Sequence, residues 1–109
     1  MRESQLEAAF RDRVRRMGGI TEKIAPTHVG MPDRLVLLPG GKVHLVELKA
    51  EGGHLRAAQE VWIARAAQLG VTVSVLTGPV ETAKWLAQRL AEIRTIGDPI
   101  SRRLGGPAR

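Results

Sequence analysis

The stretch Val43-His44-Leu45-Val46-Glu47-Leu48-Lys49-Ala50 decides the fold, because it is apolar along most of its length and reads as a strand. It follows a second β-rich run, Leu35-Val36-Leu37-Leu38, and the Pro39-Gly40-Gly41 turn between them is a hairpin signal. Side chains alternate along a strand, so Glu47 and Lys49 project from the same face, roughly 7 Å apart at the backbone. The two can therefore share one site, unless they form an ordinary ion pair where the strand end frays into solvent.

Helical and strand patterns alternate on both sides of this hairpin. Apolar residues recur at helical spacing over residues 6–17, 59–66 and 83–93. Shorter β-rich runs cover residues 20–25 and 71–75. The resulting order, αβββαβα, predicts an α/β fold with a mixed sheet flanked by helices and a C-terminal helix.

Length and charge bound the possibilities further. The 109 residues suffice for about one domain, which we expect over residues 1–97, followed by a basic tail rich in Gly, Pro and Arg over residues 98–109. Lys and Arg total 17 against 11 acidic residues, and the net charge of +6 favours nucleic acid as a partner, although many small basic proteins bind nothing anionic. No apolar run approaches the roughly 20 residues of a membrane span, so we expect a cytoplasmic protein.

The absence of cysteine restricts the metals that the chain can bind. Thiolate zinc sites are excluded, and any metal must be held by oxygen or imidazole ligands.

Asp33 is placed where it can join Glu47, because it opens the first strand of the hairpin and so lies beside the end of the second. Two carboxylates brought together repel unless a cation separates them, and such hard oxygen ligands suit Mg²⁺ or Mn²⁺. The backbone carbonyl of Leu48 can add a third protein ligand. Turn chemistry is the other interpretation of Asp33, since Pro-Asp is a common turn pair.

Together these residues resemble a known family. Pro32-Asp33 followed by Glu47-Leu48-Lys49 is similar to the PD-(D/E)xK nuclease motif. The wider pattern, with Gly30 before Pro32 and Gln59 in the next helix, resembles the VRR-NUC branch over roughly residues 3–76. The resemblance implies a restriction-endonuclease-like αβββαβ core and a metal-dependent DNA endonuclease.

The resemblance also implies roles for individual residues. Asp33 and Glu47 would hold Mg²⁺, for which Mn²⁺ would substitute. Lys49 would orient or activate the attacking water, and Gln59 would support the site from its helix.

An acid on the first helix would complete the site, and two residues compete for this role. Glu3 and Glu7 are one turn apart beside the same apolar stripe. We prefer Glu7, whose spacing to Gly18 resembles that of the first-helix acid in related resolvases. The other interpretation is structural, since Ser4-Gln5-Leu6-Glu7 is also a capping-box pattern in which Glu7 bonds back to the helix start.

For DNA contacts the candidates are Arg34, His28 and Arg11, although a lone loop histidine is usually just exposed and helix arginines often form a solvated face. By resemblance we expect a homodimer acting on branched DNA such as a four-way junction. We expect the pairing surface near Trp85 and Leu86 or at a sheet edge, unless Trp85 packs at the margin of the monomer core. The alternative functions are a nucleic-acid-binding module without catalysis, or an interaction protein in which Glu47 and Lys49 form a buried ion pair.

Overall fold

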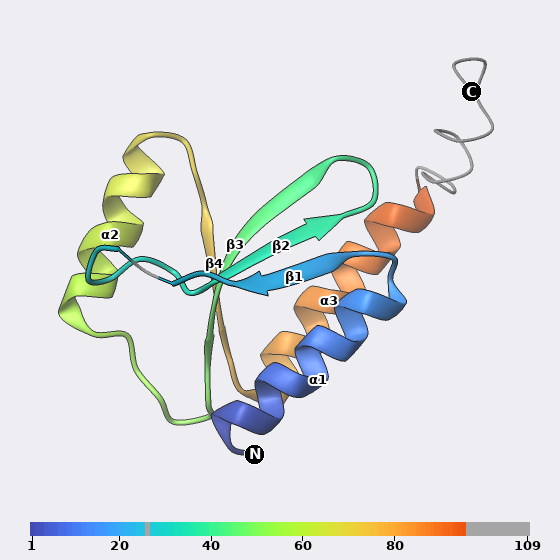
Figure 1. Cartoon of the computed structure of the whole chain (residues 1–109), viewed down its shortest axis with the longest axis horizontal. Coiled ribbons are helices and arrows are strands. Elements are labelled where there is room, and N and C mark those ends of the chain that lie inside the picture. The colour runs from blue at the N-terminus through green and yellow to red at the C-terminus, as the bar shows by residue number, and fades with distance from the viewer. Residues whose placement is uncertain (26, 96–109) are drawn as a thin grey trace.

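Three helices and four strands make up the fold, in the predicted order αβββαβα. The computed structural model describes residues 1–25 and 27–95, and the predicted basic tail lies outside them. The elements, labelled in Figure 1, are α1 (Glu3–Arg16), β1 (Ile20–Lys23), β2 (Arg34–Leu38), β3 (Lys42–Lys49), α2 (Ala57–Gln68), β4 (Val73–Thr77) and α3 (Gly78–Thr95).

The strands form one mixed sheet in the order β1-β2-β3-β4. β1 and β2 are antiparallel, as are β2 and β3, which form the predicted hairpin. β4 pairs parallel to β3, and α2 makes the crossover between them. The predicted α/β fold class with a mixed sheet is confirmed.

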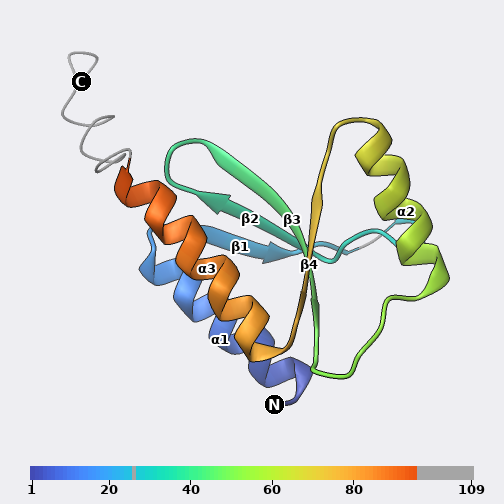
Figure 2. The same cartoon turned by 180° about the vertical axis from the view of Figure 1, so that it is seen from behind.

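One face of the sheet is covered by α1 and α3, which run along the same side in Figures 1 and 2. Even-numbered residues of β2 and β3 point to this face, and the apolar ones among them form the core with apolar residues of the two helices and of β4. The core consists of Leu6, Phe10, Val14, Val36, Leu38, Val46, Leu48, Leu76, Trp85 and Leu86. The hydrophobic effect is therefore concentrated on one side of the sheet.

Trp85 and Leu86 belong to this core, so the predicted pairing surface around them is wrong. Trp85 is 7% exposed and Leu86 only 2%. The indole lies 5.9 Å from the ring of Phe10 and donates its N–H to Ser74 Oγ at 3.2 Å. Because α3 contacts both α1 and the sheet, its buried arc is wider than a single apolar stripe, and Trp85 falls within it.

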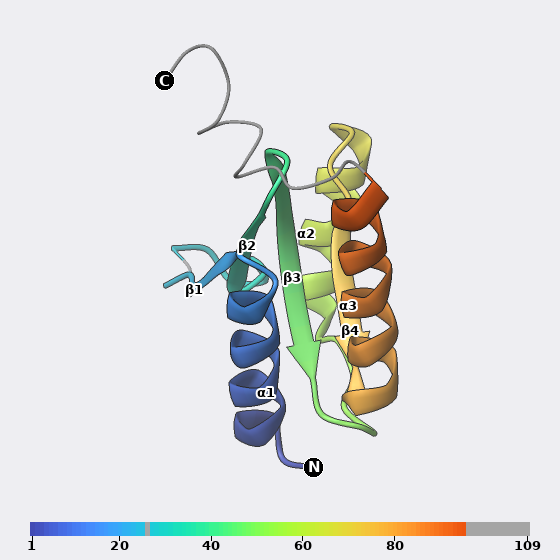
Figure 3. The ribbon, with the colours of Figure 1, turned by 90° about the vertical axis from the view of Figure 1, so that its right-hand side faces the viewer.

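The opposite face carries odd-numbered residues of β2 and β3, and α2 lies on this side, apart from the hairpin in Figure 1 and behind β3 and β4 in Figure 3. Cross-strand pairing sets the residues of this face in rows. One row joins Ile20, Leu37 and Val43, and the next joins Leu35 and Leu45. Continuing the register by one more pair aligns Asp33 with Glu47, because Arg34 pairs with Val46.

Within residues 1–25 and 27–95, no helix is both long enough and apolar enough to cross a membrane.

Candidate active site

Asp33 and Glu47 line one cavity of about 480 Å³ at the end of the hairpin, together with Gln59 from α2 and His28 from the preceding loop. The prediction that the start of β2 lies beside the end of β3 is confirmed by the register. The cavity therefore brings together four of the predicted site residues. They are Glu47 of β3, Asp33 just before β2, His28 of the loop and Gln59 of α2.

Gly30 allows this meeting, because its loop packs directly on the first turn of α2. Its φ of +96° favours glycine, and a Cβ atom there would overlap the carbonyl oxygen of Ala58. The loop that leads into Asp33 is thus held against the helix that carries Gln59. The Gly30-Met31-Pro32-Asp33 segment therefore positions Asp33 at the start of β2, beside Glu47.

Glu47 has one satisfied and one unsatisfied carboxylate oxygen. The residue is 4% exposed. Its Oε2 accepts a hydrogen bond from Gln59 Nε2 at 3.1 Å and lies 3.5 Å from Lys49 Nζ. Its Oε1 is buried and has no hydrogen-bond partner in the described part of the chain. An unpartnered buried carboxylate oxygen is costly and calls for a ligand.

The electrostatics of Glu47 agree with this geometry. Burial raises the pKa of Glu47 above its usual value, and the negative charge of Asp33 raises it further. The positive charge of Lys49 and the backbone N–H of Asp33 act in the opposite direction but do not cancel these two effects. The site therefore resists carrying two negative charges by itself.

Gln59 holds Glu47 in place through a fixed amide orientation. Its Oε1 accepts the backbone N–H of Arg56 at 2.8 Å, which caps the start of α2. That bond turns the amide nitrogen toward Glu47. Since both ends of the amide are engaged, Gln59 acts as a positioning residue and has no free oxygen for a metal.

The donor set fits a hard divalent cation held by two carboxylates. No group of three His, Cys, Asp or Glu residues in metal-binding proximity occurs among residues 1–25 and 27–95, so Asp33 and Glu47 would need further oxygen ligands from backbone, water or substrate. Mg²⁺ characteristically binds through one or two carboxylates and keeps several waters. A cation here would also satisfy Glu47 Oε1 and relieve the repulsion between the two acids. Ligation by the Leu48 carbonyl stays a prediction, and the Leu48 side chain is buried in the core.

Glu7 lies on the other face of the sheet, in a cluster that already neutralises it. Its Oε1 accepts from Arg34 at 3.1 Å and from Lys23 at 3.2 Å. Burial alone would raise the pKa of Glu7, but the hydrogen bonds and charges of Arg34 and Lys23 outweigh burial and lower the pKa. The cluster lines a separate cavity of about 400 Å³, which Arg11 also lines.

This cluster corrects two sequence-based interpretations. Arg34 was predicted to contact DNA, but its side chain is only 4% exposed and bonds to Glu7 and to Thr21 Oγ1 at 3.3 Å. The capping-box interpretation of Glu7 is also wrong. α1 begins at Glu3, and Gln5 caps it by accepting the backbone N–H of Arg2 at 2.9 Å.

The other candidates have simpler placements. Glu3 is exposed in the first turn of α1 and lines neither cavity. His28 and Arg11 are exposed, so both are accessible to a ligand.

Two basic residues near these sites, Arg56 and Lys23, were not predicted from the sequence. Arg56 lines the cavity of Asp33 and Glu47 at the start of α2, and its basic side chain one residue before a helix was the available signal. Lys23 lines both cavities and pairs with Glu7. Lys23 reaches Glu7 because β1 pairs with β2 in a register that sets Lys23 opposite Arg34, and the sequence does not show this register.

The fold and the paired carboxylates define the class as an α/β domain of the restriction-endonuclease-like type. Comparison with known proteins then gives the family. The model of the VRR-NUC domain matches residues 2–79. A protein of Acyrthosiphon pisum secondary endosymbiont phage 1, named "Putative nuclease p44", is 43% identical over 77 residues, which are 70% of this chain and 83% of the phage protein.

A solved VRR-NUC domain has the same fold, with a TM-score of 0.64 and 24% sequence identity over 85% of this chain and 94% of that domain. The chain belongs to the VRR-NUC domain family, and this membership places it among the nuclease domains.

Proposed function

We propose that the protein is a Mg²⁺-dependent endonuclease that hydrolyses phosphodiester bonds in DNA. The observation that carries the proposal is the unpartnered buried Oε1 of Glu47 beside Asp33, with Lys49 Nζ 3.5 Å from the other oxygen. Family membership and the net charge of +6 support a nucleic-acid substrate. Mn²⁺ is expected to substitute for Mg²⁺, since both suit carboxylate and water ligands.

In this mechanism Asp33 and Glu47 would hold the cation, which would supply a positive charge opposite the phosphate and lower the pKa of water. Gln59 fixes the Glu47 carboxylate so that Oε1 faces away from its amide. The Lys49 ammonium stabilises charge that builds on the phosphate during attack. His28 and Arg56 line the same cavity and would contact phosphates on either side of the cut.

We further propose that the substrate is branched DNA, such as a four-way junction, and that the active form is a homodimer. The described part of one chain offers one pair of carboxylates suited to a metal, so one chain would cut one strand at a time. Symmetric cutting of a junction needs two such sites related by a two-fold axis.

A cleavage screen tests the proposal. Branched, flapped and linear DNAs are incubated with the protein in Mg²⁺, in Mn²⁺, in Ca²⁺ and in EDTA. We expect cleavage in Mg²⁺ and Mn²⁺ only, fastest on branched DNA, and a loss of about a hundredfold in Lys49→Ala. Cleavage in EDTA would contradict the metal mechanism. Metal-insensitive binding without cleavage would favour the non-catalytic binding module.

A further inference from the structure

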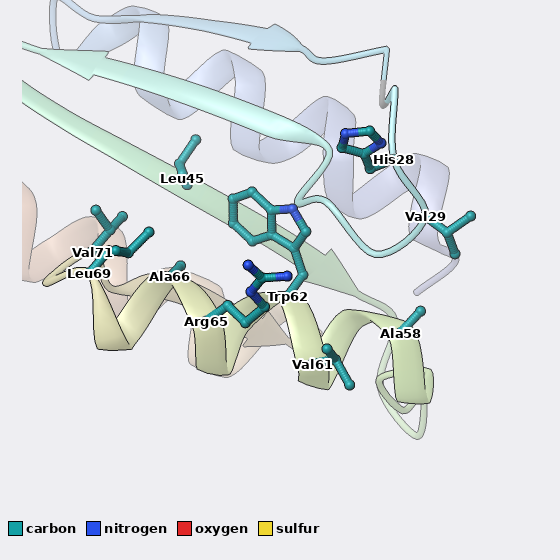
Figure 4. A pocket seen from close by; sticks show the side chains of 10 residues that line it. All are labelled: His28, Val29, Leu45, Ala58, Val61, Trp62, Arg65, Ala66, Leu69 and Val71. Atoms are coloured by element: carbon teal, nitrogen blue, oxygen red, sulfur yellow. The ribbon is translucent and has the colours of Figure 1, made fainter.

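Two cavities share lining residues with the cavity of Asp33 and Glu47, and their own linings differ. The first, of about 740 Å³, lies between α2 and the sheet and is mostly apolar, and in Figure 4 Trp62 projects into it from α2. The second, of about 400 Å³, is lined by charged and hydroxyl side chains of α1, β1 and β2, and we call it the α1 cavity. A DNA backbone is charged along its whole length, so the α1 cavity suits it better than the apolar one.

Lys23 connects the α1 cavity to the cavity of Asp33 and Glu47, because it lines both. It is the last residue of β1, which is an edge strand of the sheet. The next residue, Ile24, donates its backbone N–H to the carbonyl oxygen of Asp33 at 2.7 Å, so the chain after Lys23 is fixed directly beside Asp33. A DNA strand with one phosphate at the two acids can therefore continue past the end of β1 into the α1 cavity.

The α1 cavity has more positive than negative side chains. Three basic residues line it against two acidic ones, namely Arg11, Lys23 and Arg34 against Glu7 and Glu22. Arg34 donates to Glu7 Oε1 at 3.1 Å, and these two charges balance each other. Lys23 Nζ lies 3.2 Å from the same oxygen, which makes Lys23 a second cation on one carboxylate. The cavity can therefore accept one further negative charge.

Lys23 can exchange Glu7 for a phosphate at little cost. Its side chain is 61% exposed, and an ion pair that reaches solvent contributes little to stability. Arg34 remains on Glu7 when Lys23 leaves, because the Arg34 side chain is only 4% exposed and cannot turn toward solvent without disrupting the core side of the sheet. The buried pair thus keeps Glu7 neutralised while the exposed cation becomes available to a ligand.

We propose that the α1 cavity binds a backbone phosphate of the DNA strand that is cut at Asp33 and Glu47, about one or two nucleotides from the cut. Lys23 holds this phosphate from β1 and Arg11 holds it from α1. Arg11 is exposed and belongs to no ion pair among the residues that the structure describes. The inference rests on the proposed endonuclease function and deepens it, because it gives the cut strand a path around the β1 edge of the sheet.

Binding of uncut DNA tests the inference apart from cleavage. The dissociation constant for a four-way junction is measured in Ca²⁺ over a range of salt concentrations. Lys23→Ala and Arg11→Ala should each raise it about tenfold, and each should reduce the slope of log affinity against log salt by about one, as loss of one phosphate contact does. Lys23→Arg should retain both the affinity and the slope. Both native side chains are exposed, so the variants should fold, which circular dichroism checks.

Lys42→Ala is the matched control, because it removes the same charge from an exposed lysine at the other end of the hairpin, opposite Leu38. It should leave the affinity and the salt slope near those of the wild type. A general effect of net charge would instead weaken binding equally in Lys42→Ala and Lys23→Ala.

Neutral phosphates locate the contact on the substrate. Once the cut in the junction is mapped, a methylphosphonate replaces one phosphate at a time on both sides of it. At one of these positions the wild type should show a KM raised about tenfold with kcat unchanged, since the contact is the same in the ground state and the transition state. The same substitution should have no further effect on Lys23→Ala, which has already lost the contact. A lysine that only supported Glu7 would show no dependence on the position of the neutral phosphate.

Three results would overturn the inference: wild-type affinity in Lys23→Ala, equal weakening by Lys42→Ala, or independent effects of Lys23→Ala and the methylphosphonate at every position. A wild-type chain that shows the expected binding results but cuts no DNA in Mg²⁺ or Mn²⁺ would contradict the endonuclease proposal and support the phosphate site. The two failures are therefore distinguishable.

Discussion

Glu7 and Glu47 are two carboxylates on opposite faces of one sheet, and their surroundings differ in what they leave unsatisfied. Glu7 accepts from two cations, Arg34 and Lys23, and its pKa is lowered despite burial. Glu47 is more deeply buried and faces another acid, so its pKa is raised, and one of its oxygens has no hydrogen-bond partner among the described residues. Glu7 has its counter-charges within the protein, whereas Glu47 needs one from outside.

The comparison shows how neighbours in sequence come to serve different purposes. Asp33 and Arg34 are adjacent, and strand alternation sends their side chains to opposite faces. Arg34 reaches Glu7 on the α1 side, whereas Asp33 joins Glu47 on the α2 side. Arg34 and Glu7 thus form an ion pair that stabilises the fold, whereas Asp33 and Glu47 form a site that still lacks a cation.

The largest expected effect is on the incomplete site. Glu47→Gln should reduce cleavage by a thousandfold or more, because loss of the cation removes several kcal/mol of charge stabilisation. The apo variant should be at least as stable as the wild type, since the repulsion with Asp33 is gone. Mg²⁺ should raise the thermal midpoint of the wild type and not of the variant. Asp33→Asn should behave in the same way.

Glu3→Gln is the control, because Glu3 is exposed and lines neither cavity. It should preserve cleavage and the Mg²⁺ effect. Unfolding of Glu47→Gln would instead favour a structural ion pair between Glu47 and Lys49.

The sequence predicted that Asp33, Glu47 and Lys49 meet at one end of the hairpin, because the determinants of this meeting are local. Alternation along β3 joins Glu47 to Lys49, and the hairpin brings Asp33 beside them. Gln59 was recognisable as a polar residue on an apolar helical stripe. What the sequence did not reveal depends on long-range packing. The partners of Glu7 follow from how α1 lies on β1 and β2, and burial of Trp85 follows from the contact of α3 with α1.

The second prediction concerns the completed cluster. Glu7→Ala should lower the free energy of unfolding by about 3 kcal/mol, because it leaves the buried Arg34 guanidinium without its anionic partner. Lys23→Ala should cost less than about 1 kcal/mol, since the Lys23 side chain is 61% exposed. Urea denaturation measures both. If Glu7→Ala keeps its stability and loses cleavage, then Glu7 is the catalytic acid that the family resemblance implies.

The smallest expected effect is on how the free energy of unfolding depends on pH, which should differ in sign between Glu7 and Glu47. Urea unfolding in EDTA measures it for the wild type and for the amide variants Glu7→Gln and Glu47→Gln. In each variant the substituted group no longer titrates. The folded-state pKa of Glu7 is lowered, so its contribution to stability is present above the usual value of 4.5 and is lost as pH falls through the lowered pKa. The wild type should therefore lose its advantage over Glu7→Gln on acidification. The folded-state pKa of Glu47 is raised, so its contribution is present below 4.5 and is lost as pH rises through the raised pKa. Glu47→Gln should gain on the wild type over that rise. If the two differences changed with pH in the same direction, the two carboxylates would share one kind of environment, and the contrast between a completed and an incomplete site would fail.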